Sequence, residues 1–273
     1  MKLALIQQHA TKDKASNVAR GLAALEKAAR SGAQLACFAE LAFEWFYPQV
    51  PAGPAFRELA EPLDGPTVKA FQQKARELGI VTVINLYERD GANTYDSSPV
   101  IDADGTLLGV TRMIHITDYP CFHEQGYYTP GDKGAPVYQT RAGAVGVAIC
   151  YDRHFPEYMR ALALGGADVV VVPQAGAVDE WPEGLYEAEM RVAAFQNGYF
   201  TALCNRVGKE DTLDFAGESF VCGPGGEVLG RAPKSVDAIL YADIDVAATA
   251  ASNARRLFMR DRRPQLYADW LAR

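Results

Sequence analysis

Hydrophobic positions along the chain fall into two recurring patterns. Short continuous apolar runs predict strands buried on both faces, and the clearest is the run of four valines within Asp168–Val172. Longer segments with apolar residues three or four positions apart predict amphipathic helices, as in Ala15–Arg30, which is followed by Gly32. On this basis strands are expected at residues 3–8, 34–39, 80–87, 98–102, 107–112, 145–149, 168–172, 199–205, 219–222, 228–231 and 239–244, and helices at residues 15–30, 66–78, 156–164 and 185–196.

These elements predict one α/β domain that spans residues 1–273. No linker rich in Pro, Gly or Ser divides the chain, and the tail from Ala247 onward is expected to be helical. The turn sequences Asp102–Gly105 and Pro224–Gly226 predict hairpins among the alternating strands and helices, so the sheets should be mixed. Helices covering two packed, mixed β-sheets would form a four-layer α-β-β-α sandwich.

The amino-acid composition limits which kinds of molecule the protein is expected to bind. Hydrophobic residues make up 49% of the chain and charged residues 22%, which is ordinary for a globular protein. The net charge of −7 argues against nucleic acid as a partner, because phosphate binding needs basic patches. The first residues lack the long apolar region of a signal peptide, and no apolar run is long enough for a membrane helix, so a soluble, cytoplasmic protein is expected. The five cysteines and four histidines show no metal-ligand or disulfide spacing, so neither a metal nor a cofactor is predicted.

Cys150 occupies the most informative position in the chain. An apolar stretch runs into this thiol, and Phe155-Pro156-Glu157 then opens a helix. A nucleophile at such a strand–turn–helix junction projects beyond the sheet edge, and neighbouring backbone N–H groups can bind an anion. The N-terminus of a helix also favours thiolate. The alternative is a small buried hydrophobe, which is the commonest role of a free cysteine.

Two glutamates are candidates to assist a thiol nucleophile. Glu40 directly follows the expected strand at residues 34–39, so it would lie at a sheet edge, as Cys150 does. Glu124 lies in an aromatic segment that ends in turn residues and is typical of a pocket wall. A cysteine nucleophile needs a base to remove its proton, and a carboxylate can serve. Taken singly, each glutamate fits an ordinary surface charge better than a catalytic role.

Three further side chains are candidates for contacts with a substrate. Gln174 follows another expected strand, where α/β sheets usually bind ligands. Tyr47 lies in an aromatic loop after Glu40, and Arg153 follows the nucleophile. Loop packing is the alternative for Tyr47, and a structural ion pair is the alternative for Arg153.

Taken together, these segments resemble the nitrilase superfamily of carbon–nitrogen hydrolases. The resemblance follows the family's order over nearly the whole chain and is closest to the branch of N-carbamoyl amine and N-carbamoyl amino acid amidohydrolases. It implies that Cys150 is the nucleophile, Glu40 the base and Glu124 a second, structural glutamate. It also implies a homodimer or larger homo-oligomer. The matching segments are Phe38–Leu41, Asp102–Gly109, His123–Asp132, Gly146–Glu157, Asn205–Gly208 and Gly217–Phe220.

One position departs from this family's pattern. The family reads Arg-Lys-x-His after the hairpin, whereas this chain reads Arg112-Met113-Ile114-His115, so the family's catalytic lysine falls on Met113. In the enzymes it resembles, that lysine stabilises an oxyanion, whereas methionine has no donor and no charge. Losing one such donor costs roughly 2.7–4 kcal/mol, and the N–H of Tyr151 would remain as an oxyanion donor. Strand alternation places His115 on the same face as Met113, so His115 is a candidate replacement donor.

Two functions therefore stay open. The first is a hydrolase that opens a non-peptide C–N bond of a linear amide or N-carbamoyl group through a cysteine thioester, with Glu40 or Glu124 protonated near neutral pH. The second is a catalytically impaired or inactive relative that binds a small amide ligand. Either would take a small amide or ureido molecule without a membrane or nucleic-acid partner. The apolar helix Leu185–Gln196, with Tyr186, Met190 and Phe195, and the tail are candidate interface elements.

Overall fold

Two β-sheets pack face to face in the computed structural model, which describes residues 1–271. The first sheet has the strand order β15-β1-β2-β3-β5-β4, with β6 paired to β5, and the second has the order β14-β13-β10-β9-β8-β7. Both contain parallel and antiparallel pairs. The strands are β1 (Lys2–Gln7), β2 (Leu35–Phe38), β3 (Val81–Val83), β4 (Leu86–Asp90), β5 (Asn93–Ile101), β6 (Leu107–Arg112), β7 (Val137–Thr140), β8 (Gly143–Val147), β9 (Val169–Gln174), β10 (Phe200–Asn205), β13 (Phe220–Cys222), β14 (Val228–Arg231) and β15 (Ala238–Asp243), with β11 (Val207–Lys209) and β12 (Asp214–Ala216) as a separate pair.

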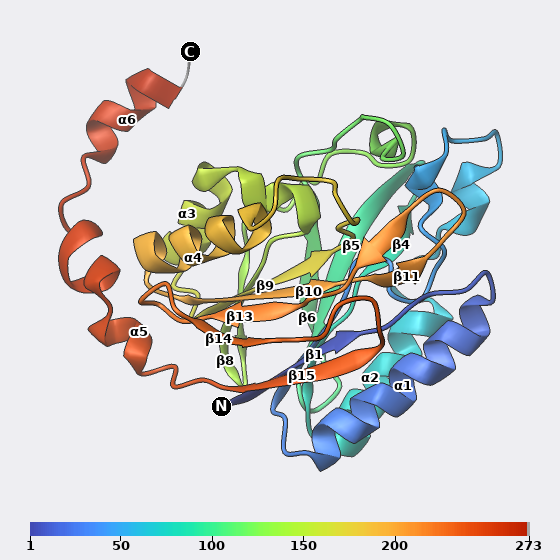
Figure 1. Ribbon diagram of the computed structural model, residues 1–273, viewed down its shortest axis with the longest axis horizontal. Helices are drawn as coiled ribbons and strands as arrows, with labels where there is room; N and C mark the ends of the chain where they lie inside the picture. Colours follow the sequence, from blue (N-terminus) through green and yellow to red (C-terminus); the bar gives the residue numbers. More distant parts are fainter. Residues whose placement is uncertain (272–273) are drawn as a thin grey trace.

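Helices cover the outer face of each sheet, so the predicted four-layer sandwich is confirmed. The first sheet carries α1 and α2, and the second carries α3 and α4 (Figure 1). The inner faces meet where β1 and β2 contact β9 and β10. The α-helices are α1 (Lys14–Arg30), α2 (Pro66–Leu78), α3 (Pro156–Leu164), α4 (Leu185–Asn197), α5 (Ala248–Ala251) and α6 (Pro264–Leu271), and the shorter helical turns are η1 (Tyr47–Gln49), η2 (Phe56–Leu59), η3 (Glu124–Gly126), η4 (Cys150–His154) and η5 (Ala254–Phe258).

The valine run of β9 shows why the apolar pattern predicted this architecture. Val169 and Val171 belong to the core between the two sheets, whereas Val170 and Val172 belong to the core beneath α3 and α4. Successive side chains of a strand point to opposite faces, so a central strand that is covered on both sides needs apolar residues at every position.

The expected strand at residues 80–87 is interrupted, and this break matters for the site. The chain forms β3, leaves the ladder at Ile84 and Asn85, and resumes as β4. The buried Asn85 side chain accepts a hydrogen bond from the N–H of Leu41 at 2.7 Å and donates one to Asp96 Oδ1 at 2.6 Å. A polar side chain inside an apolar run thus bridges β5 and the loop after β2.

The tail after β15 leaves the body of the sandwich and curves away along one side (Figure 1). It is helical, as expected, and α6 exposes Leu266, Trp270 and Leu271. In the part of the chain that the structure describes, no helix is both long and apolar enough to cross a bilayer.

Candidate active site

Cys150 lies at a tight turn between β8 and α3, as the apolar pattern predicted. It is the first residue of the 3₁₀ turn η4 and has a positive φ of 42°. A non-glycine residue in this conformation costs on the order of 1–3 kcal/mol and persists when the surrounding structure imposes it. Here the Asp152 N–H donates to the Ile149 carbonyl at 2.9 Å, and Arg153 Nη1 donates to the Cys150 carbonyl at 2.8 Å.

Three carboxyl groups gather beside this thiol. Glu40, Asp96 and Glu124 are each fully buried, and they come from the loop after β2, from β5 and from η3. The Glu40 carboxyl lies next to the Asp96 carboxyl and the Cys150 thiol, and both neighbours influence its pKa. Within residues 1–271, no amide, hydroxyl or guanidinium group donates to either oxygen of Glu40 or Glu124, or to Oδ2 of Asp96.

The buried Arg206 helps to place Glu40 at this position. Its guanidinium donates to the backbone carbonyls of Glu40 and Glu44, each at 3.0 Å, and it pairs with Glu210. The loop after β2 is therefore held by its backbone, and the Glu40 side chain is left to face the thiol.

Burial dominates the acid–base properties of the cluster. Burial, followed by the negative charge of Glu124, raises the pKa of Glu40 from 4.5 to about 8. Burial also raises the pKa values of Asp96 and Glu124 well above the ordinary range, and the negative charges of neighbouring carboxyls add to both effects.

The thiol does not gain the low pKa that a helix N-terminus favours. Burial, followed by the charge of Glu40, raises the pKa of Cys150 well above its ordinary value, against the opposing effects of the Arg153 charge and the Ala175 N–H. Cys150 is only 6% exposed, and η4 is too short to supply a strong dipole. Thiolate must therefore form through transfer of the proton to a base.

Arg153 and Gln174, which the sequence placed on different segments, meet beside Cys150. Arg153 Nη1 donates to Gln174 Oε1 at 2.7 Å, and its Nε lies 3.3 Å from Glu189. Gln174 is the last residue of β9, and its buried Nε2 has no acceptor within residues 1–271. This unpaired amide is available to a polar group of a ligand.

The segment that contains Met113 has left the sheet. Because β6 ends at Arg112, strand alternation does not continue to His115. Arg112 binds Glu88, Asp90 and Asp132, and Met113 is buried in the core cluster that contains Cys150. The His115 ring is 2.6 Å from Asp152 and stacks on Phe155 at 3.5 Å, so it faces the base of η4 rather than sharing a face with Met113.

The two tyrosines singled out from the sequence lie on different sides of the site. The Tyr151 ring packs against His154 and Phe155, while its N–H is at the first turn after the nucleophile. The Tyr47 ring packs against Tyr87, which in turn contacts Tyr128, so aromatic rings separate Tyr47 from the carboxyl groups.

The sequence analysis missed Asp96 and Glu180. Asp96 lies within the buried polar run Asp96–Ser98 of β5, an unusual composition for a strand core that could have marked it. Glu180 lies in the turn beyond Gln174 and accepts hydrogen bonds from the hydroxyls of Tyr119 (2.6 Å) and Tyr186 (2.5 Å) and from the N–H of Ala177 (2.8 Å).

Glu180 stands beside a groove of about 530 Å³. Trp181 and Tyr186 line this groove, together with the acidic residues Asp179, Glu183, Glu187 and Glu218 and the basic residues Arg231 and Lys234. The negative charge of Cys150 would raise the pKa of Tyr186, and the charge of Glu180 raises the pKa of Glu124. Glu180 is therefore electrostatically coupled to Glu124 and lies near Tyr186, which is itself close to Cys150.

Comparison with known proteins agrees with this geometry. The chain is 36% identical over 279 residues to an N-carbamoylputrescine amidase of Solanum lycopersicum, with 97% of this chain and 93% of that enzyme covered. A carbon-nitrogen hydrolase of Helicobacter pylori G27 superposes with a TM-score of 0.92 at 30% identity and 99% and 98% coverage. A mutant amidase of Nesterenkonia sp. AN1, in which glutamate is replaced by glutamine, superposes with a TM-score of 0.84 at 27% identity and 99% coverage of both chains, and it carries acrylamide added to its active-site cysteine.

The family model for the carbon-nitrogen hydrolases matches residues 2–254, which include all three carboxyl groups and the thiol of the site. This chain belongs to the carbon-nitrogen hydrolase family.

Proposed function

We propose that this enzyme hydrolyses the ureido group of an N-carbamoyl amine through a covalent intermediate on Cys150. The observation that carries the proposal is the buried thiol at the β8–α3 turn, next to the fully buried Glu40 carboxyl. The cysteine adduct in the Nesterenkonia amidase supports the same role for Cys150.

The proposed reaction needs one base that works twice. Glu40 takes the thiol proton while the Cys150 sulfur attacks the carbonyl carbon. The N–H group of Tyr151, and that of Ala175, which acts on the Cys150 sulfur, are the proposed donors to the developing oxyanion. The C–N bond then breaks, and the departing amine or ammonia takes the proton from Glu40. Water next gives a proton to Glu40 and attacks the thioester. The C–S bond then breaks, and Glu40 returns that proton to the sulfur, which restores the thiol and the carboxylate. Glu124 positions Glu40 or the substrate.

The test of this proposal is ammonia release from a panel of linear amides and N-carbamoyl amines. We expect turnover of ureido substrates by the wild type. A protein that binds these compounds without turning any of them over would contradict the proposal and favour the ligand-binding alternative.

The surroundings of Glu180 support a substrate with a positive charge. Three donors hold this carboxylate, whose chain neighbours Asp179 and Trp181 line the groove. N-carbamoylputrescine, the substrate in the name of the tomato relative, carries a protonated amine at the end opposite its ureido group. We infer that the ammonium group binds near Glu180, while the ureido carbonyl reaches Cys150 and the free amide of Gln174.

Replacing Glu180 with glutamine should therefore weaken binding of cationic substrates. We expect KM for N-carbamoylputrescine to rise about 10- to 100-fold, because a charge-assisted hydrogen bond is worth roughly 1.5–3 kcal/mol. The uncharged analogue N-butylurea should be affected much less. Glu183→Gln, on the exposed rim of the same groove, is the matched control. An equal loss on both substrates would mean that Glu180 only maintains the fold.

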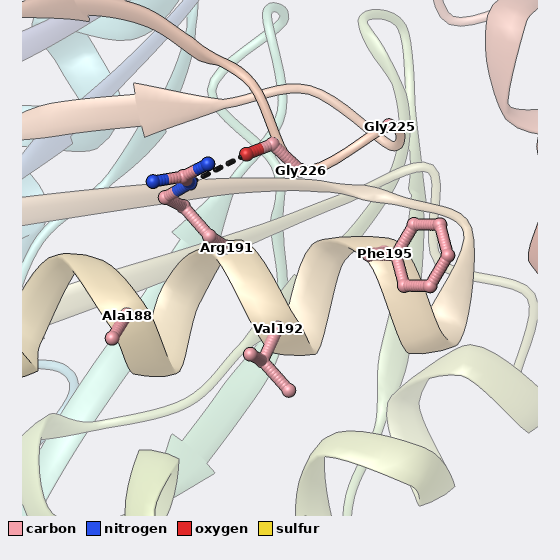
Figure 2. Close-up of a pocket in the computed structure, with 6 residues that line it drawn as sticks. All are labelled: Ala188, Arg191, Val192, Phe195, Gly225 and Gly226. Carbon is pink, nitrogen blue, oxygen red and sulfur yellow. Dashed lines mark hydrogen bonds between the residues drawn. The ribbon is translucent and has the colours of Figure 1, made fainter.

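We also propose that the enzyme is a homodimer through α4. Met190, an expected interface residue, is instead buried in the core, and Tyr186 turns toward Glu180. Figure 2 shows what α4 presents outward: Val192 (50% exposed) and Phe195 (37% exposed) line a depression of about 400 Å³, with Arg191 bound to the Gly226 carbonyl at 2.7 Å.

An apolar surface of this kind is what a second copy of the chain would cover. Val192→Glu should place a charge in that interface and convert a dimer into a monomer, as measured by light scattering at micromolar concentration. Val50→Glu alters an equally exposed valine outside α4 and should leave the mass unchanged. A wild-type protein that is already monomeric would contradict the dimer.

A further inference from the structure

Asp96 is held in place by a hydrogen bond to only one of its two oxygens. The Asn85 amide donates to Asp96 Oδ1 at 2.6 Å and to Ser98 Oγ at 3.0 Å. The backbone is fixed as well, because the Met113 N–H donates to the Asp96 carbonyl at 2.9 Å. The other oxygen, Oδ2, is buried and has no hydrogen-bond partner within residues 1–271, and the same is true of both oxygens of the neighbouring Glu40 carboxyl.

Asp96 is surrounded mainly by negatively charged side chains from several neighbouring elements. Glu40, Glu124 and Asp152 each act on it with a negative charge, from the loop after β2, from η3 and from η4. The buried Tyr128 hydroxyl lies near the same carboxyls. The cations act at the edge of this group, with Arg206 on Glu40 and Arg153 on Cys150. Met113, which lies next to the Asp96 carbonyl, brings no charge.

Two buried carboxyl groups in contact cannot both be ionised at neutral pH, because each raises the cost of the other's charge. A hydrogen bond between them requires a proton, and whichever carboxyl keeps that proton becomes the donor. Asp96 receives one amide hydrogen bond and no cation, whereas Glu40 lies near Arg206 and the thiol. Of the two carboxyls, Asp96 is therefore the one that retains the shared proton more readily.

We propose that Asp96 is a positioning residue that stays protonated and donates a hydrogen bond to Glu40, holding the Glu40 carboxylate toward the Cys150 thiol. The inference rests on the proposed role of Glu40 as the base. The arrangement Asp96–H···Glu40⁻···H–S–Cys150 leaves a single negative charge in the cluster before the reaction begins. A donor to the ionised form of Glu40 also lowers the pH at which this base becomes available.

Two variants distinguish the hydrogen-bond donor of Asp96 from its possible negative charge. Asp96→Asn keeps a donor of the same shape that cannot ionise, and Asp96→Leu removes the donor. We expect kcat/KM of Asp96→Asn to stay within about threefold of the wild type, with the rise in activity still centred at the pH at which Glu40 ionises, about 8. In Asp96→Leu we expect a loss of about 10- to 100-fold and a shift of this rise to higher pH. If Asp96→Asn lost as much activity as Asp96→Leu, the charge would be required and the proposal would be wrong.

Infrared difference spectroscopy tests the same point without a substrate. The wild type minus Asp96→Asn spectrum at pH 7 should show the C=O stretch of a protonated carboxylic acid. A carboxylate band in its place would overturn the proposal, even if the enzyme were fully active. Conversely, the protein could show the C=O band of a protonated acid and yet hydrolyse no amide. That result would support a protonated Asp96 and contradict the proposed function. The infrared measurement and the Asn variant also decide the question if Asp96→Leu fails to fold.

Discussion

Replacing Cys150 with alanine is expected to abolish ammonia release from every substrate, with a loss of about 10⁶-fold in kcat, the scale seen when a catalytic nucleophile is removed. In the proposed mechanism the sulfur forms the covalent bond to the carbonyl carbon, and alanine has no atom that can do so. Glu40 is a neighbouring carboxyl, but it is fully buried, and in the proposed mechanism it serves as the base. Residual turnover should reflect only binding and the oxyanion donors.

The measurement is ammonia release under saturating substrate, together with mass spectrometry for a covalent adduct on Cys150 during turnover. Cys121→Ala is the matched control, because Cys121 is more exposed than Cys150 and also has a positive φ. The control should retain activity. A Cys150→Ala protein that still releases ammonia would remove the thiol from the mechanism, and an adduct on Cys121 would place the nucleophile there instead.

Replacing Glu40 with glutamine should have the second-largest effect, a fall in kcat/KM of about 10²–10⁴-fold, which is the usual contribution of a general base. Glutamine keeps the shape of the side chain but cannot accept the thiol proton. Because burial raises the pKa of Cys150, the thiol ionises poorly without help, and losing the base should be costly. Glu58→Gln, which changes an exposed glutamate on η2, should leave kcat/KM unchanged.

The pH dependence follows from the sign of the Glu40 shift. The carboxyl must be ionised to act as a base, so wild-type kcat/KM should rise with pH through about 8 and be low near pH 5. This rise should be absent from the residual activity of Glu40→Gln. An activity that falls as pH increases from 6 to 8 would show that the protonated form of Glu40 is the working one.

The raised pKa of Glu40 also makes the free energy of unfolding depend on pH. A carboxyl whose pKa is raised on folding keeps a proton that the unfolded chain has already released, so its contribution to stability is complete below the unfolded value of 4.5 and is lost as pH rises through about 8. The free energy of unfolding of Glu40→Gln should therefore depend less on pH across this window than that of the wild type. Denaturant unfolding at pH 5 and pH 8 measures the difference.

The fold could be predicted from the sequence more completely than the site could. Apolar runs determine where strands lie, because a buried strand needs apolar residues at every position, and β9 shows this directly. Cys150, Glu40 and Gln174 were found because each follows such a run, and strand ends that meet at one edge bring their side chains together. The motif order then identified the family, which the comparisons confirm.

The contacts of side chains whose partners are distant in sequence became clear only in the tertiary structure. Strand alternation failed for His115 because β6 ends at Arg112, and the ring follows Asp152 instead. Met190 is buried because α4 turns that face onto the second sheet, although its sequence alone is equally compatible with an interface.

The sequence by itself determined the four-layer architecture and the position of Cys150 at the turn between β8 and α3, since both depend on local runs of apolar residues and on turns. Only the tertiary structure decided that Asp96 joins Glu40. That contact requires β4 and β5 to pair, Asn85 to leave its strand and the loop after β2 to return to the same point. The protonation of a buried carboxyl depends on every charge and dipole around it in space, and no local pattern of residues contains that information.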